Sequence, residues 1–177
     1  MGGETTSKGE SVDAQVTSSQ NDNGLSADMA PLIVMLVAWL ALRLLGMVGI
    51  VPAADSWQSA LRFALAAMFT FTAVSHFLPR TRPDLVRMVP SGLPWPQHLV
   101  TLTGLLELAG AVGLLIPLLV QAAAYALAAL LVAMFPANLH AARARLSVAG
   151  RTAMPLRTRL PLQIFWIAAL LYIAGTS

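Results

Sequence analysis

The stretch LVTLTGLLELAGAVGLLIPLLVQAAAYALAALLVAMFPANL, residues 99–139, decides the fold because Glu107 is its only charged residue. A helix crosses roughly 30 Å of hydrocarbon with about 20 residues, so this stretch is long enough to cross a membrane twice. Pro117 divides it, because proline breaks the hydrogen-bond ladder of a helix. The stretch therefore predicts two membrane-spanning helices, at 99–119 and 122–139, joined by a tight turn.

Three further apolar stretches flank this pair, at 31–52, 58–78 and 160–175. None of the five has the polar face that a helix on the surface of a soluble protein would show. The composition agrees, with 57% hydrophobic and 11% charged residues. We therefore expect an all-α fold: an integral membrane helical bundle of five transmembrane helices that occupies residues 30–177.

The first 29 residues have a different composition, rich in Gly, Ser, Thr, Asn and Asp and almost free of large apolar side chains. Such a segment cannot bury enough apolar surface to offset the entropy lost on ordering, so residues 1–29 are expected to be a disordered tail. No basic segment precedes a short hydrophobic core, so a cleaved signal peptide is not expected.

Arginines lie in alternate loops of the expected bundle, which predicts its orientation. The loops after the second and fourth spans contain Arg80, Arg82, Arg87, Arg143, Arg145, Arg151, Arg157 and Arg159. The loops on the opposite side carry only Asp55. Because loops rich in Lys and Arg stay in the cytoplasm, we expect a multi-pass cell-membrane protein with a cytoplasmic N-terminus and an extracytoplasmic C-terminus. Basic residues placed beside spans indicate a lipid bilayer as partner and not a nucleic acid.

The chain has no cysteine, which excludes disulfides, thiolate metal sites and covalent haem attachment within it. It also has no metal-ligand spacing, nucleophile triad, phosphate-binding loop or dinucleotide fingerprint. We therefore expect no metal site, and no motif names a catalytic residue.

Glu107 is the first chemical clue, because it lies about 13 Å into the third span, near the middle of the bilayer. A carboxylate there is costly unless it is protonated or paired, so acids inside a membrane are candidates for function. Arg43 is expected at a similar depth in the first span, and an Arg43–Glu107 contact is the pairing hypothesis. Alternatively, Glu107 is a neutral packing residue, or the pair only fixes the register of the helices.

The second clue is a group of polar residues at span ends. His76 ends the second span, and Asn138 and His140 end the fourth, so all three are expected near the cytoplasmic interface. The two histidines could hydrogen-bond a quinone carbonyl or ligate haem, with quinone the preferred cofactor class; alternatively they are ordinary interfacial hydrogen-bonding residues. Arg62, one turn into the second span from the outer side, is expected to extend its side chain to the interface.

From Arg62 to about Tyr172 the sequence resembles the DoxX-like family of small bacterial membrane proteins. The resemblance rests on Arg62 entering a span, Ser75-His76-Phe77, Met88-Val89-Pro90 followed by Leu93-Pro94, Gly104-Leu105-Leu106-Glu107, Gly113-Leu114-Leu115 and Phe135-Pro136-Ala137-Asn138. It implies a four-helix transmembrane bundle, to which the span with Arg43 is an added N-terminal helix. It nominates His76, Glu107 and Asn138 as site residues, supported by Arg62. Ala73 stands where the family would place a glycine.

Members of that family include a membrane subunit of a thiosulfate:quinone oxidoreductase, and others are associated with redox-stress complexes. The first hypothesis is therefore a membrane subunit of a redox system that binds a quinone or another small lipophilic molecule and works with a membrane or soluble redox partner. The second is a non-catalytic scaffold or chaperone that holds a partner protein through the proline-rich loop 79–97 and the arginine loops. A small-solute transporter is disfavoured, because the spans show no inverted repeat.

Overall fold

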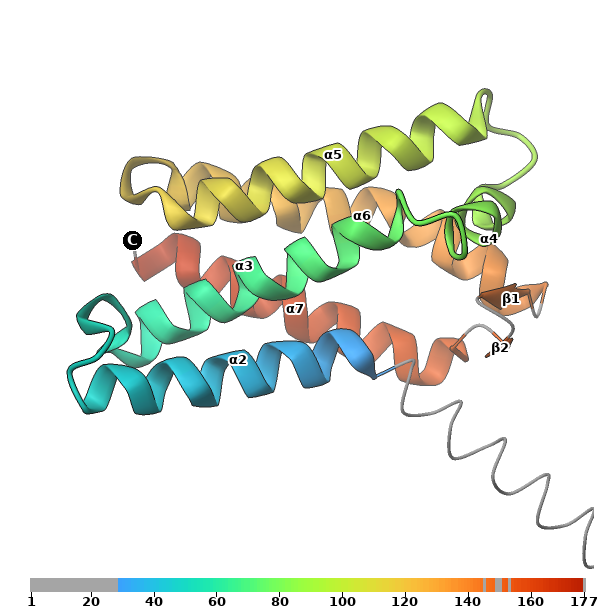
Figure 1. The fold of residues 1–177 in the computed structure, drawn as a ribbon. Helices are drawn as coiled ribbons and strands as arrows, with labels where there is room; N and C mark the ends of the chain where they lie inside the picture. Colours follow the sequence, from blue (N-terminus) through green and yellow to red (C-terminus); the bar gives the residue numbers. More distant parts are fainter. Residues whose placement is uncertain (1–28, 145, 149–150, 153, 177) are drawn as a thin grey trace, which may run out of the picture. The chain divides into compact units, whose positions relative to one another are not determined.

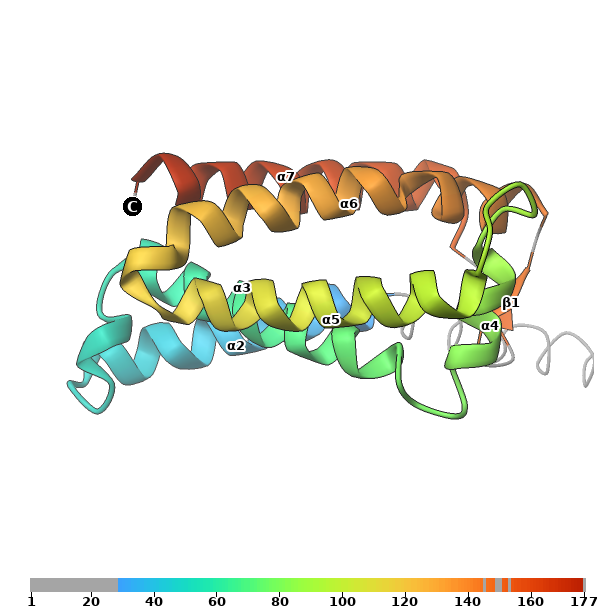
Figure 2. The ribbon, with the colours of Figure 1, turned by 90° about the horizontal axis from the view of Figure 1, so that it is seen from above.

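Five long helices make up most of the chain in the computed structural model, which describes residues 29–144, 146–148, 151–152 and 154–176. Their bounds are Ala30–Met47 (α2), Trp57–Ser75 (α3), Pro96–Leu115 (α5), Val120–Arg143 (α6) and Leu156–Thr176 (α7). Within the unit Pro31–Ser177 they run in alternating directions and lie side by side as an antiparallel bundle (Figures 1 and 2). Residues 1–28 of the expected tail lie outside the described residues.

Local sequence signals explain where several helices begin and end. Ser56 caps α3: its hydroxyl accepts from the backbone N–H of Ser59, whose hydroxyl in turn faces the backbone N–H of Ser56. α2 ends at Met47, and Gly49, two residues later, adopts the left-handed conformation, with φ +77°, that commonly follows the end of a helix. Pro117 starts the short 3₁₀ helix Pro117–Leu119 (η2), so the predicted tight turn between α5 and α6 is confirmed.

Glycines let α5 approach both of its neighbours closely. A Cβ built at Gly104 would lie 2.6 Å from the Cβ of His76, the residue that caps the end of α3. On the α6 side, one at Gly110 would lie 2.5 Å from Leu127 Cδ2, and one at Gly113 would lie 2.7 Å from Ala123 Cβ. Real side chains do not approach this closely, so α5 is held by helix contacts that only glycine permits, as is common between membrane helices.

One apolar core joins the helices. Its largest fully buried side chains include Phe69, Leu65 and Met68 on α3, with Leu114, Leu127 and Leu170 on the other helices. Large apolar side chains are also exposed along the outside of the bundle, such as Val37, Leu102 and Val132. An apolar exterior around an apolar core is the pattern of a protein whose surroundings are themselves apolar.

Four helical segments are long and apolar enough to cross a membrane: α2, α5, the continuous segment Pro117–Arg143 and α7. The sequence predicted a fifth span at 58–78, which corresponds to α3. Polar residues such as Gln58, Ser59 and Arg62 make α3 less apolar than the others. Seven residues of α3 are buried against its neighbours, and a helix whose inner face is covered by protein needs less apolar surface of its own.

The connections from α3 to α5 and from α6 to α7 contain short elements that the pattern of apolar residues did not predict. The loop expected at 79–97 contains a short helix, Arg82–Met88 (α4), with proline in its first turn. Between α6 and α7, Ser147–Val148 (β1) pairs antiparallel with Arg151–Thr152 (β2). Another short 3₁₀ helix, Pro52–Ala54 (η1), connects α2 to α3 at the opposite end.

Candidate functional site

His76 and Glu107, two of the residues nominated from the sequence, meet in the structure. His76 caps the C-terminal end of α3, and Glu107 lies in the middle of α5. His76 Nε2 lies 3.7 Å from Glu107 Oε2, and the two residues are only 9% and 4% exposed. This separation is longer than a hydrogen bond, so the two groups face each other without being bonded.

The protonation of His76 follows from the contacts of its other nitrogen. Nδ1 lies 2.9 Å from the carbonyl oxygen of Val100, which can only accept a hydrogen bond. Nδ1 therefore carries a proton, and in the neutral imidazole Nε2 is the bare nitrogen. The Thr103 hydroxyl, 3.3 Å from Nδ1, lies on the same side of the ring. His76 thus presents a free acceptor nitrogen to Glu107.

Glu107 has one oxygen that is not used by its surroundings. The Thr72 side chain on α3 lies near the carboxyl group, and its hydroxyl donates to the Phe69 carbonyl at 3.1 Å. Oε2 is buried, and among the described residues it has no hydrogen-bond partner. A bare imidazole nitrogen and a carboxylate oxygen are both acceptors, so the pair is stable only with a proton on one of them. The pair is therefore a buried acid–base couple that can hold one exchangeable proton.

Arg82 fixes the end of α3 that carries His76. Its Nη1 donates to the His76 carbonyl at 3.1 Å, and its Nη2 donates to Thr101 Oγ1 at 2.8 Å. The Thr81 hydroxyl donates to the Ser75 carbonyl just before His76. These bonds satisfy carbonyls at the end of α3 and join that end to the first turns of α5. The imidazole is therefore held from its backbone as well as from its ring.

The expected Arg43–Glu107 pair is wrong. Arg43 Nη1 donates instead to the backbone carbonyl of Asp55, and the guanidinium lies 5.4 Å from the centroid of the Trp57 ring. The sequence placed Arg43 in the middle of a span at 31–52, but α2 ends at Met47, so Arg43 lies about one turn from the helix end. At that position it contacts the connection to α3 and not the carboxyl in the middle of α5.

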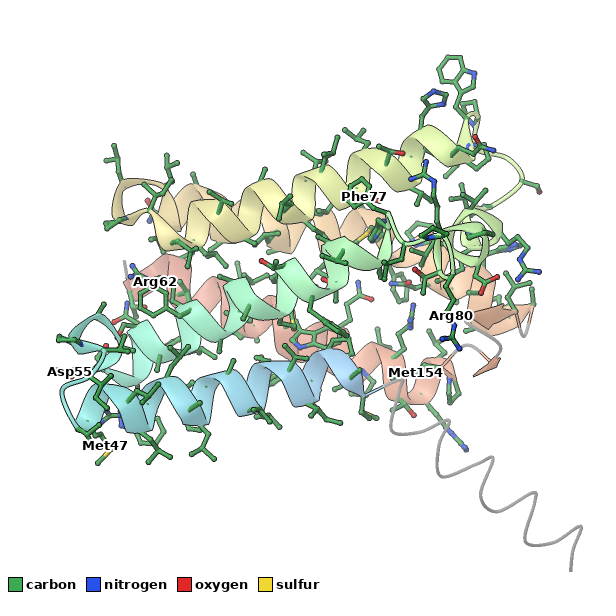
Figure 3. The ribbon with its side chains drawn as sticks, in the orientation of Figure 1. Met47, Asp55, Arg62, Phe77, Arg80 and Met154 are labelled. Carbon is green, nitrogen blue, oxygen red and sulfur yellow. The ribbon has the colours of Figure 1, made fainter. Side chains whose placement is uncertain are left out.

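Arg62 does not support His76 either. The two are 14 residues apart on one helix, which corresponds to about 21 Å along its axis. Figure 3 shows Arg62 at the end of the bundle that holds Asp55 and Met47, whereas Phe77, beside His76, lies toward the other end, with Arg80 and Met154. The Arg62 guanidinium lies 4.8 Å from the centroid of the Phe63 ring. Its role is local to that end.

Asn138 is nominated by the resemblance, but its side chain has another partner. Its Oδ1 accepts a hydrogen bond from Arg159 Nη1 and so links α6 to α7. His140 is partly buried near the end of α6. Within the part of the chain that the structure describes, neither residue forms a hydrogen bond or ion pair with His76 or Glu107. The structure thus reduces the predicted site to the His76–Glu107 pair.

Thr72, Val100 and Arg82 belong to the surroundings of the pair and were missed in the sequence. Thr72 had a recognisable signal, because it lies four residues before His76 and so shares its helix face. Val100 acts through its backbone carbonyl, which no side-chain pattern reveals. In the sequence, Arg82 was one of the loop arginines that predict the orientation of the bundle. Its hydrogen bonds depend on how the loop around α4 folds, which the sequence pattern does not reveal.

An open groove of about 560 Å³ also runs between α5 and α6, lined by small residues such as Gly110, Gly113, Ala126 and Ala133. Neither His76 nor Glu107 lines it. Among the described residues, no three His, Asp or Glu side chains come together as metal ligands. The His76–Glu107 pair therefore remains the candidate site, because its side chains can bind a ligand or exchange a proton.

Comparison with known proteins assigns a family without an activity. No curated protein and no solved structure matches the chain. One family model, described as a domain of unknown function (DUF8561), matches residues 65–174, which includes both members of the pair. The match covers more than half of the chain. The protein therefore belongs to the DUF8561 family.

Proposed function

We propose that this protein is a five-span membrane protein that binds a small lipophilic molecule with a hydrogen-bonding head group, of the quinone class, at the His76–Glu107 pair. In this proposal α3 is the fifth span, and the arginine-rich end with α4 faces the cytoplasm. The resemblance to DoxX-like proteins, some of which work with quinones, supports this proposal. We further propose that the protein is a subunit of a redox system.

A single observation carries the proposal: Glu107 Oε2 is buried, lacks a hydrogen-bond partner among the described residues and lies 3.7 Å from a nitrogen that is bare in the neutral ring. A quinone carbonyl is an acceptor and takes a hydrogen bond from the protonated carboxyl. A quinol hydroxyl is a donor and gives one to the carboxylate. The same oxygen thus serves both forms of the ligand, while His76 holds or releases the proton that Glu107 exchanges.

The surroundings of the pair would strengthen a hydrogen bond to such a ligand. Glu107 is enclosed by apolar helices, where a hydrogen bond is stronger than in water and an unpaired polar group is more costly. His76 is fixed through Val100 and Arg82, so it does not have to be ordered when a ligand binds.

The test is binding of menadione, a small naphthoquinone, to the purified protein in lipid nanodiscs, measured by calorimetry against empty nanodiscs. Menadione accepts from the protonated, uncharged carboxyl, and loss of such a bond to a buried partner costs about 1–3 kcal/mol, so Glu107→Leu, which has no donor, and His76→Phe should each raise the Kd by about fivefold or more. His98→Phe is the matched control, because His98 is exposed at the start of α5. Equal affinity in all four proteins, or no heat above that of empty nanodiscs, would refute the proposal.

A further inference from the structure

A second buried polar group lies on α7, away from the His76–Glu107 pair. Gln163 is 5% exposed, and its Nε2 donates to the Leu131 carbonyl of α6 at 2.7 Å. Oε1 of the same amide is buried and has no hydrogen-bond partner among the described residues. An unpaired buried acceptor costs about 1–3 kcal/mol, and more where no water reaches it.

Trp166 offers the complementary group. It lies three residues after Gln163, so both side chains leave the same face of α7. The Trp166 ring packs against the core, and its Nε1 is buried without an acceptor in the described part of the chain. An indole N–H only donates, whereas an amide oxygen only accepts. One turn of α7 therefore carries an unused donor and an unused acceptor.

We propose that Gln163 and Trp166 form a binding site for one hydroxyl group. Its oxygen accepts from Trp166 Nε1–H, and its hydrogen is donated to Gln163 Oε1. Residues three apart on a helix are neighbours on one face, and one oxygen with two hydrogen bonds of about 2.8 Å joins a donor and an acceptor that lie up to about 5–6 Å apart. Water supplies this chemistry, and so does the hydroxyl of a lipophilic phenol or quinol.

The site is independent of the proposed function. It is built on α6 and α7, whereas His76 and Glu107 lie on α3 and α5. The bond from Gln163 to the Leu131 carbonyl also fixes the amide: with Nε2 used as donor, Oε1 is the atom that remains for the hydroxyl. The two residues would bind water or a ligand hydroxyl even if no quinone bound at the pair.

Gln121 provides a matched control on the same pair of helices. Like Gln163, it joins α6 and α7 through its amide, donating from Nε2 to the Ala174 carbonyl at 3.2 Å. Unlike Gln163, it is exposed, at the start of α6. Replacing Gln121 removes the same kind of helix–helix bond without touching the proposed site.

The test is the ¹H–¹⁵N resonance of the Trp166 indole in full-length protein in nanodiscs. It is assigned by its loss in Trp166→Phe or, if that variant does not fold, by elimination with Trp39→Phe, Trp57→Phe and Trp95→Phe. Bound water should give a cross-relaxation peak between this proton and water that menadiol, added under argon, does not change. A ligand hydroxyl should instead shift the resonance on titration with menadiol. Either result supports the site.

Gln163→Met keeps the length of the side chain and removes the acceptor. It should abolish the water peak or the menadiol shift of the Trp166 indole, and Gln121→Met should leave both unchanged. The proposal is wrong if the wild-type indole shows neither signal. It is also wrong if the signal survives in Gln163→Met, because the hydroxyl would then be held without the amide.

Discussion

The position of His76 depends on the absence of a side chain at Gly104. A Cβ there would lie 2.6 Å from His76 Cβ and 3.0 Å from Phe77 Cε2, so one of these residues has to move. We expect Gly104→Ala to lower the free energy of unfolding by about 1–3 kcal/mol, as overpacking of a core does. It should also weaken menadione binding, because the imidazole is pushed out of line with Glu107.

Gly92→Ala is the control for this change, since nothing lies within 4 Å of a Cβ built at Gly92. Denaturant unfolding and menadione calorimetry, run on both variants, measure the two effects. If Gly104→Ala matches Gly92→Ala in both measurements, the close approach of α3 and α5 does not hold the imidazole.

The contacts of His76 also predict which ring nitrogen carries the proton. The Val100 carbonyl, 2.9 Å from Nδ1, requires a proton there. At a pH where the ring is neutral, ¹⁵N NMR should show a protonated Nδ1 and a bare Nε2. His98 is exposed and should show the mixture of tautomers that water permits. A protonated Nε2 in neutral His76 would remove the free acceptor that faces Glu107.

At the residue scale, the sequence identified the polar residues that matter but not their partners. Glu107 and His76 stand out because polar groups are rare in apolar spans, and burial confirms how unusual they are. The depth of Arg43 was wrong because residues 48–51 are apolar without being part of α2. Apolar composition does not locate a helix end, whereas the glycine at position 49 did mark it.

At the scale of elements, the Asn138–Arg159 bond joins α6 to α7 near one end of both helices. We expect Asn138→Ala to lower the free energy of unfolding by about 1–3 kcal/mol, because a bond to a charged group is lost. Menadione affinity should not change, since the amide oxygen is already used. Unfolding and calorimetry on this variant decide between a structural and a ligand-binding role. A Kd raised as far as in Glu107→Leu would return Asn138 to the site.

α3 is less apolar than the other long helices but no less buried, so a pattern of apolar residues describes it poorly. It is not among the four segments that are apolar enough to cross a membrane, yet seven of its residues are buried, as many as in α5 or α6. Neighbouring helices, and not lipid, surround its inner face. Its polar residues bond within the helix instead: Thr70 donates to the Ala66 carbonyl and Ser75 to the Thr72 carbonyl.

At the scale of the whole bundle, Glu107 and Gln163 lie at nearly the same level. Gly110 and Gly113 of α5 meet Leu127 and Ala123 of α6, so in antiparallel helices Glu107 lies beside residues 129–130. Gln163 of α7 bonds to the Leu131 carbonyl. Glu107 and Gln163 therefore share a layer, which the linear sequence conceals because their register depends on helix packing. A buried polar layer of this kind is costly to keep, which favours a role in binding.

Whether α3 crosses the membrane decides the topology, and the cysteine-free chain makes this directly measurable. Asp55 precedes α3 and Gly92 follows it, and both are exposed. If α3 crosses, single Asp55→Cys and Gly92→Cys variants lie on opposite sides. In intact cells a membrane-impermeant maleimide should then label Asp55→Cys, and Gly92→Cys should react only after permeabilisation. The unsubstituted chain is the blank. Labelling of both variants from the same side would mean that α3 does not span, and the reverse pattern would invert the proposed orientation.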